Sequence, residues 1–147
     1  MKPIGFKLVD AYALEVQGVF LDLHNDYELS EVCAEFGTNS LRLSWSRSVE
    51  EHVSPGLPLA VHLIVKGAKG MRSLPPKDNW EAGGGRTLSF VGFLHVDQAQ
   101  VMTGCVDYSE AGQGPDFIVG FEDESALKIF GSDGILEAEL SEVGCGG

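Results

Sequence analysis

The residues best suited to chemistry form one dense polar run of two aspartates around a histidine: Asp22, His24 and Asp26. On an extended strand, side chains two residues apart share one face, so these three would point to the same side. Carboxylate oxygens and imidazole nitrogens are common metal ligands, and His62 or His95 could supply a further one. The alternative is a strand end that runs into an Asx turn, in which such side chains bind the backbone.

Other catalytic patterns do not rise above background. His62 and His95 lie in apolar runs, where a histidine is more often a hydrogen-bonded residue at the core edge than a general base. Residues 83–86 lack the Lys-Ser/Thr of a P-loop, and no nucleophile elbow precedes a helix. The three cysteines lack metal-ligand spacing. We therefore predict no catalytic residue and no cofactor, and the balance is against an enzyme.

Acidic residues dominate the second part of the chain. The net charge is −12 over the 147 residues. From Thr87 onward there are one lysine and eleven acids, so this stretch alone carries −10. Such a charge repels nucleic-acid backbones and anionic lipid, which argues against nucleic-acid and membrane partners. It can attract a basic protein, and it can equally serve only solubility.

The acids predicted to contact a partner are Glu122, Asp123 and Glu124 in a polar turn, and Glu137 and Glu139 on a later strand. The last two alternate with apolar residues, which places both carboxylates on the solvent face of that strand. We expect all five to belong to the exposed face of one C-terminal meander.

The elements that must position these residues are short strands. Nineteen glycines and many short apolar runs favour a mainly β fold, a single-domain antiparallel sandwich or partly open barrel. In the C-terminal part, Leu127 and Ile129 are expected to face the core and Lys128 the solvent. The strands are predicted at 4–9, 12–16, 19–23, 41–45, 59–65, 88–96, 100–106, 117–121, 127–129 and 136–140.

Residues 26–36 fit two structures. Leu29, Val32 and Phe36 form a helical stripe, which allows one short helix. Val32 and Phe36 also fit strand alternation, and the clear strand at 41–45 favours a hairpin, which we prefer.

Two segments, 49–58 and 73–86, are predicted to be long loops. The second contains Trp80, which could anchor an interface or plug the loop onto the core. The domain core is expected at about 4–140, with a flexible tail at 141–147. No signal peptide or membrane span is recognised, and the cysteine usage favours a cytoplasmic location.

The run from Phe20 to Leu29, followed by the strand Leu41 to Trp45, resembles a pattern in small bacterial β-rich domains. Some of these domains are uncharacterised, and others resemble immunity proteins of contact-dependent or polymorphic toxin systems. The resemblance implies a mainly β single domain with no known catalysis. Asn25, which separates His24 from Asp26, departs from the His-Asp dipeptide of the pattern.

The leading hypothesis is a cytoplasmic bacterial domain that binds a protein, with an immunity-like role as its sharpest version. In that version the acidic half docks against a basic toxin face. One alternative is a small-ligand or metal-binding β-barrel. The other is a homo-oligomeric structural module, for which a homodimer is the simplest form.

Overall fold

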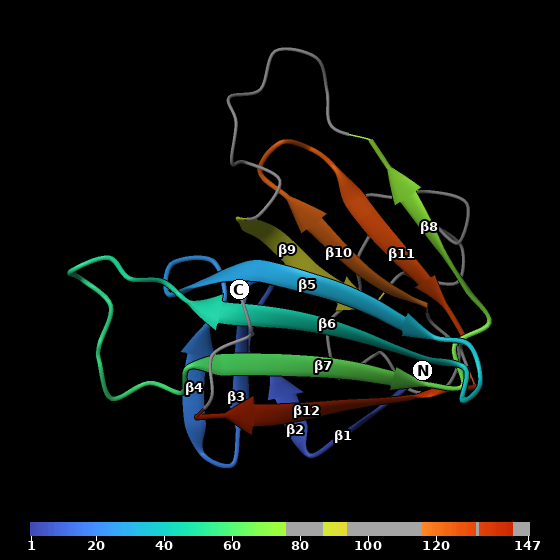
Figure 1. Ribbon diagram of the computed structural model, residues 1–147, viewed down its shortest axis with the longest axis horizontal. Coiled ribbons are helices and arrows are strands. Elements are labelled where there is room, and N and C mark those ends of the chain that lie inside the picture. Colours follow the sequence, from blue (N-terminus) through green and yellow to red (C-terminus); the bar gives the residue numbers. More distant parts are fainter. Residues whose placement is uncertain (76–86, 94–115, 132, 143–147) are drawn as a thin grey trace.

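The computed structural model describes residues 1–75, 87–93, 116–131 and 133–142, and every regular element in these ranges is a β-strand. The strands form three sheets (Figure 1). The predicted mainly β, antiparallel fold is therefore confirmed. A membrane-spanning helix does not occur among the described residues.

The largest sheet has five strands, and it joins the two ends of the described chain. The two neighbouring strands at one edge of this sheet pair in parallel and align Lys2 with Ile135. All its other pairs are antiparallel. In spatial order the strands are β1 (Lys2–Ile4), β12 (Ile135–Ser141), β7 (Ala60–Lys66), β6 (Ser40–Arg47) and β5 (Tyr27–Glu35).

Two smaller sheets complete the fold, and both are antiparallel. The four-stranded sheet has the order β8 (Gly70–Leu74), β11 (Ala126–Phe130), β10 (Phe117–Phe121) and β9 (Leu88–Phe93). The three-stranded sheet has the order β2 (Phe6–Leu8), β3 (Ala13–Val16) and β4 (Val19–Asp22).

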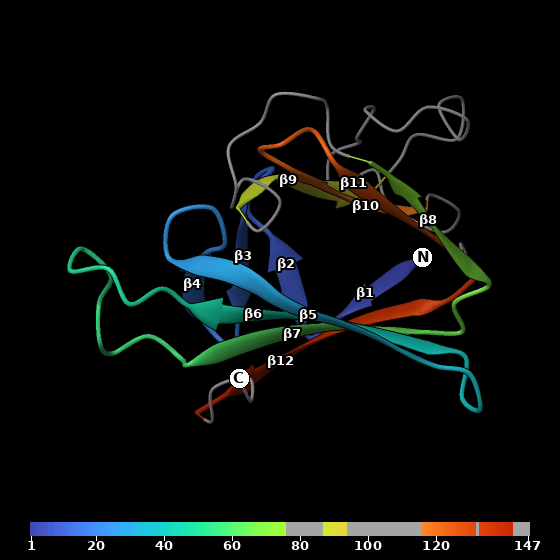
Figure 2. The ribbon, with the colours of Figure 1, turned by 45° about the horizontal axis from the view of Figure 1, so that its top comes forward.

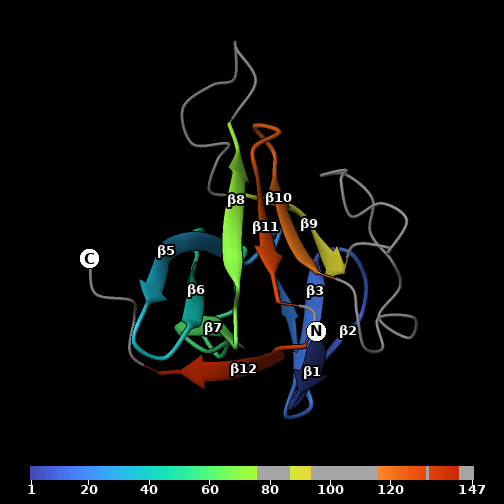
Figure 3. The ribbon, with the colours of Figure 1, turned by 90° about the vertical axis from the view of Figure 1, so that its right-hand side faces the viewer.

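All three sheets share one core. The four-stranded sheet faces the five-stranded sheet, and the three-stranded sheet lies beside them (Figure 2). Trp45 of β6, Phe117 of β10 and Leu14 of β3 are fully buried members of the same hydrophobic cluster. On the side away from the three-stranded sheet, the outer strands β5 and β8 stand apart (Figure 3). The sandwich is therefore closed on one side and open on the other.

Both links between the two larger sheets pass through one corner of the molecule. One link joins β7 to β8 and the other joins β11 to β12. The N–H of Lys69 in the first link donates to the carbonyl of Phe130, which begins the second, at 2.8 Å. Gly67, Gly131 and Gly134 occupy this crossing, and we call them the glycine corner.

The glycine corner disfavours side chains through its backbone angles and through close backbone contacts. Gly67 and Gly131 have φ angles of +78° and +140°, a region that residues with a Cβ rarely adopt. A Cβ on Gly134 would lie 2.7 Å from the carbonyl oxygen of Lys66, which is part of the β7 backbone. The two links can pack this closely because all three positions are glycine.

The strand predicted at 4–9 is interrupted, because Gly5 has a φ of +77° and turns the chain between Ile4, the last residue of β1, and β2. This lets β1 join the five-stranded sheet and β2 the three-stranded one. At the break expected near Gly18, Gln17 and Gly18 have φ angles of +53° and +79°. Two successive positive φ angles are typical of the tight turn of a two-residue hairpin.

Residues 26–36 form strand β5 and not the alternative short helix, so the hairpin is confirmed. Strand β5 pairs with β6 from Tyr27 to Glu35, with a bulge at Ser30. The apolar stripe that suggested a helix is not buried, because Val32 and Phe36 are exposed. Pairing with β6 therefore overrides the local helical pattern.

Strand β8 lies where no strand is predicted. Its residues are all exposed, and Gly70, Arg72 and Ser73 lack the branched or aromatic side chains typical of strands. Residues 73 and 74 of the predicted loop at 73–86 therefore belong to β8, and residues 76–86 lie outside the described ranges. Residues 49–58, predicted to be a loop, form turns and bends. The predicted strand at 100–106 also lies outside the described residues.

The expected C-terminal meander is wrong in its last strand. Strands β10 and β11 form a hairpin, but β12 leaves it and pairs with β7 and β1. Leu127 and Ile129 face the core as predicted. Lys128, expected in solvent, is 3% exposed, and its Nζ lies 5.0 Å from the centroid of the Phe130 ring. The second face of β11 is therefore covered at this point.

We expect Gly134→Ala to lower the free energy of unfolding by more than about 1 kcal/mol, because its Cβ would meet backbone that cannot move aside. Gly37→Ala is the control: a Cβ there meets nothing within 4 Å, so its effect should be below about 0.5 kcal/mol. Chemical denaturation followed by tryptophan fluorescence measures both. Equal effects would show that the corner tolerates a side chain.

Candidate functional site

Asp22 is the last residue of β4, and His24 and Asp26 lie in the turn that leads to β5, so the three predicted metal ligands do not share one extended strand. The Oδ1 of Asp22 accepts the backbone N–H groups of His24 at 3.0 Å and Asn25 at 2.9 Å, and its Oδ2 accepts the Asn25 side-chain amide at 2.8 Å. Partial burial and the nearby Asp22 charge raise the pKa of Asp26. The Asx-turn alternative is therefore the observed structure.

His24 is held by the neighbouring sheet. Its Nδ1–H donates to the carbonyl of Leu88 at 2.5 Å, and its Nε2 lies 3.8 Å from a carboxylate oxygen of Glu122. His52 lines the same polar cleft, of about 210 Å³, and its Nδ1 lies 3.2 Å from a carboxylate oxygen of Glu50. Over the described residues, however, no three His, Cys, Asp or Glu side chains are placed to hold a metal ion.

His62 lies in strand β7, in a different sheet from His24. Its Nδ1 is hydrogen-bonded to the hydroxyl of Ser44 at 2.8 Å, and Ser44 is fully buried. Burial and the Arg42 charge lower the pKa of His62, and the Glu139 charge partly opposes them. The geometry is that of a neutral histidine in a structural hydrogen bond. His95 and Trp80 lie outside the described residues.

Three of the predicted contact acids form the turn between β10 and β11. Glu122 faces His24 and Glu124 is exposed, whereas Asp123 is 9% exposed. The carboxylate of Asp123 accepts both the N–H and the hydroxyl of Ser125. Asp123 therefore stabilises the turn itself.

The other two predicted contact acids lie on β12, in the five-stranded sheet. Glu137 forms an ion pair with Lys66 at 2.7 Å, which raises the pKa of Lys66. Glu139 is exposed opposite His62. Because β12 does not join the β10–β11 hairpin, the five acids do not share one meander.

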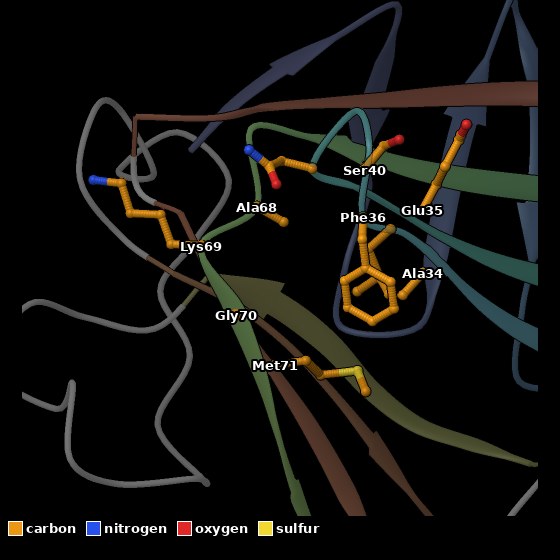
Figure 4. Close-up of a pocket in the computed structure, with 10 residues that line it drawn as sticks. Ala34, Glu35, Phe36, Ser40, Ala68, Lys69, Gly70 and Met71 are labelled. Atoms are coloured by element: carbon orange, nitrogen blue, oxygen red, sulfur yellow. The ribbon is translucent and has the colours of Figure 1, made fainter.

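An apolar cleft, which we call the edge cleft, opens between the β5–β6 turn and the start of β8 (Figure 4). Its volume is about 330 Å³. Phe36 and Met71 line it and remain 89% and 46% exposed. Ala34, Leu41 and Ala68 add further apolar surface.

The edge cleft lies between two strands with free edges. Strand β5 is the last strand of the five-stranded sheet and β8 the last of the four-stranded sheet. Residues 30–39 and all of β8 are exposed. The N–H of Ala68 donates to the carbonyl of Asn39 at 2.9 Å, which ties the β5–β6 turn to the link beside the glycine corner. The cleft is thus fixed by the fold.

A second recess, of about 320 Å³, lies at the same end of the β5–β6 hairpin and is lined by Cys33, Arg42 and Ile64. These residues alternate along their strands with the core-facing ones, so the recess lies on the outer face of the sheet. Ala34 and Glu35 border both recesses. The end of the hairpin is therefore hollowed on each face.

The two free edges differ in charge. Strand β5 contains Glu28, Glu31 and Glu35 and no lysine or arginine. Arg72 is the charged residue of β8, and Lys69, which precedes that strand, forms an ion pair with Asp133 at 3.4 Å. The β5 edge is therefore acidic and the β8 edge basic.

Sequence reasoning did not select Phe36 or Met71 as functional residues. Strand alternation assigns Phe36 to the core side, and Met71 lies in a segment without a strand pattern. One signal was present, because Phe36 directly precedes the turn residues Gly37 to Asn39. An aromatic residue at the end of a hairpin can extend beyond the facing sheet.

Comparison with known proteins finds no matching family model, no similar curated protein and no similar solved structure. The resemblance drawn from residues 20–29 and 41–45 therefore stays a prediction.

We expect the stability of the chain to fall at mildly acidic pH, in part because of His62. In the unfolded chain His62 protonates near its ordinary pKa of 6.5, whereas the lowered pKa of the folded state resists protonation. Stability from this residue is therefore present above pH 6.5 and lost below it. The thermal midpoint should decrease as the pH is lowered from roughly 7.5 to 5.5, and His62→Asn should weaken this pH dependence.

The matched control is His52→Asn, because His52 is 55% exposed and lies outside the strands. This variant should keep the pH dependence of the native chain. If both variants show the same slope of thermal midpoint against pH, the explanation based on His62 is wrong.

Proposed function

We propose that this protein is a small cytoplasmic, non-catalytic domain of bacterial type that binds a basic protein partner. Its binding surface is the edge cleft together with the acidic strand β5. Both lie on the open side of the sandwich, where neither larger sheet covers the other (Figure 3).

The observation that carries this proposal is the exposure of Phe36. Its side chain is 89% exposed, and Met71 at 46% borders the same cleft. Exposed apolar groups clustered beside a recess are typical of interaction surfaces, where an aromatic side chain often acts as an anchor. Covering Phe36 alone would contribute about 2 kcal/mol to binding before the costs of association.

Charge supports a basic partner. Glu35 lines the cleft, Glu31 is exposed on the same strand, and the whole chain carries −12. Complementary charge speeds association and selects the partner. In this proposal Glu124 and Glu139 contribute to the field at longer range, while the residues of β5 make the contacts.

The sharper version is an immunity-like role, in which the partner is a toxin with a basic active face and binding covers that face. The resemblance predicted for residues 20–29 and 41–45 to bacterial immunity-like domains favours this version.

A non-catalytic role is supported by the engagement of the candidate catalytic groups. The Nδ1 of His24 binds the Leu88 carbonyl, and His62 binds Ser44. The hydroxyl of Ser44 is fully buried, so a substrate could not reach it. These pairs stabilise strands and turns and leave little for acid–base chemistry.

Affinity capture from an extract of the native host tests the proposal. We expect the native chain to retain a protein of basic isoelectric point, with recovery that falls as salt rises from low to moderate concentration. The double variant Phe36→Ser with Met71→Ser should lose at least about tenfold of this recovery, because it removes the apolar anchor while both positions are already exposed.

The control variant is Val49→Ser, since Val49 is 100% exposed in the loop between β6 and β7, away from the edge cleft. Its recovery of the partner should match that of the native chain. The proposal is overturned if no basic protein is retained, or if the double variant retains it as well as the control does.

A further inference from the structure

We infer that the partner of the proposed binding surface is an extended strand that pairs with the free edge of β5, with basic and apolar side chains in alternation. This inference rests on the proposed function and specifies its mode: strand addition to the five-stranded sheet.

The free edge of β5 is long enough to template a strand. It has nine residues and pairs along one side with β6. No other described strand pairs with its second side. Alternate residues of such an edge direct their N–H and C=O groups away from the sheet, where an extended segment can bind them. Ser30 to Glu35 are all exposed, so this stretch is accessible.

The two recesses determine which side chains such a strand would carry. Successive side chains of an added strand point to opposite faces of the sheet. On the inner face they would meet the edge cleft, with Phe36 and Met71. On the outer face they would meet the recess beside Cys33, which Glu35 borders. The inner face therefore favours apolar side chains, which fall at every second residue.

Charge selects the residues in between. On the outer face, Glu31 and Glu35 flank Cys33 on β5, and Arg42 already pairs with Glu31 at 3.1 Å. Lysine or arginine on the outer side of the added strand would face Glu35 directly. Opposite charges in adjacent strands are favourable, and like charges are unfavourable.

The edge of β8 is the weaker candidate. It has five residues, and Arg72 would repel a basic strand. Pairing of β5 with β5 of a second copy is disfavoured too, since it would bring Glu31 and Glu35 of two chains together. The bulge at Ser30 further limits a flat self-pairing. The edge of β5 thus disfavours pairing with a second copy of itself and remains accessible to a basic strand.

Two synthetic peptides of equal composition test the inference on the full chain. In the first, lysine and valine alternate over about the length of β5; in the second, the same residues stand in two blocks. We expect the alternating peptide to bind at least about tenfold more tightly. Amide hydrogen exchange by NMR should slow at every second residue of 30–35 when it is bound. Tighter binding of the block peptide, or unchanged exchange in β5, would overturn strand addition.

Proline substitution adds a second readout. Adjacent residues of an edge strand direct their N–H groups to opposite sides, so one of Cys33→Pro and Ala34→Pro removes an outward N–H and spares the ladder to β6. That variant should keep its thermal midpoint within a few degrees and lose at least about tenfold in affinity for the alternating peptide. Should both prolines unfold the chain, the hydrogen-exchange pattern decides.

The outcomes separate this inference from the proposed function. Suppose that the native chain binds a host partner, that the Phe36 and Met71 double variant loses it, and that binding does not protect β5 from exchange. This result would support the proposed function and overturn strand addition. Protection of β5 that rises with protein concentration without peptide would overturn it in favour of a second copy. If the native chain retains no host partner and does not bind the alternating peptide, both the proposed function and strand addition are overturned.

Discussion

The fold depends on the close passage of two backbone links at the glycine corner. Gly67 and Gly131 adopt positive φ angles, and Gly134 lies against the Lys66 carbonyl, so the β7–β8 and β11–β12 links cross almost in contact. Each link carries the chain from one large sheet to the other. Their contact therefore fixes how the sheets face each other, and with it the position of Asn39 and Ala68 at the base of the edge cleft.

A sandwich joined at one corner must be covered elsewhere, or it leaves edges exposed. The three-stranded sheet covers one side, and Leu14 and Leu21 add to the common core. On the other side β5 and β8 keep free edges and exposed apolar groups. Long exposed edges are a hazard that proteins limit with charges and bulges. Here the acidic residues of β5 and the bulge at Ser30 are such limits, and they also define which strands remain acceptable.

Much of the strand content follows from local alternation, as in Leu41, Leu43 and Trp45, because burial on one face imposes a period of two. Strand partners do not follow, since pairing is decided by distant residues. Alternation in β12 does not reveal that it joins β7 rather than β11. Sequence reasoning also found the polar run at Asp22, but whether its carboxylate binds a ligand or its own turn depends on φ and ψ angles. The edge cleft escaped notice because β8 has weak strand propensity.

The parallel pair of β1 and β12 has a consequence for how the chain folds. Strand β12 lies between β1 and β7, so the N-terminal strand has no place in the five-stranded sheet until residues 135–141 are available. During synthesis, β5, β6 and β7 can form a local antiparallel unit early, while β1 still lacks its partner strand β12. Contacts that join the two ends of a chain close the largest loops and slow folding. Completion of this sheet is therefore expected to be a late step of folding, with the edge of β7 exposed until it occurs.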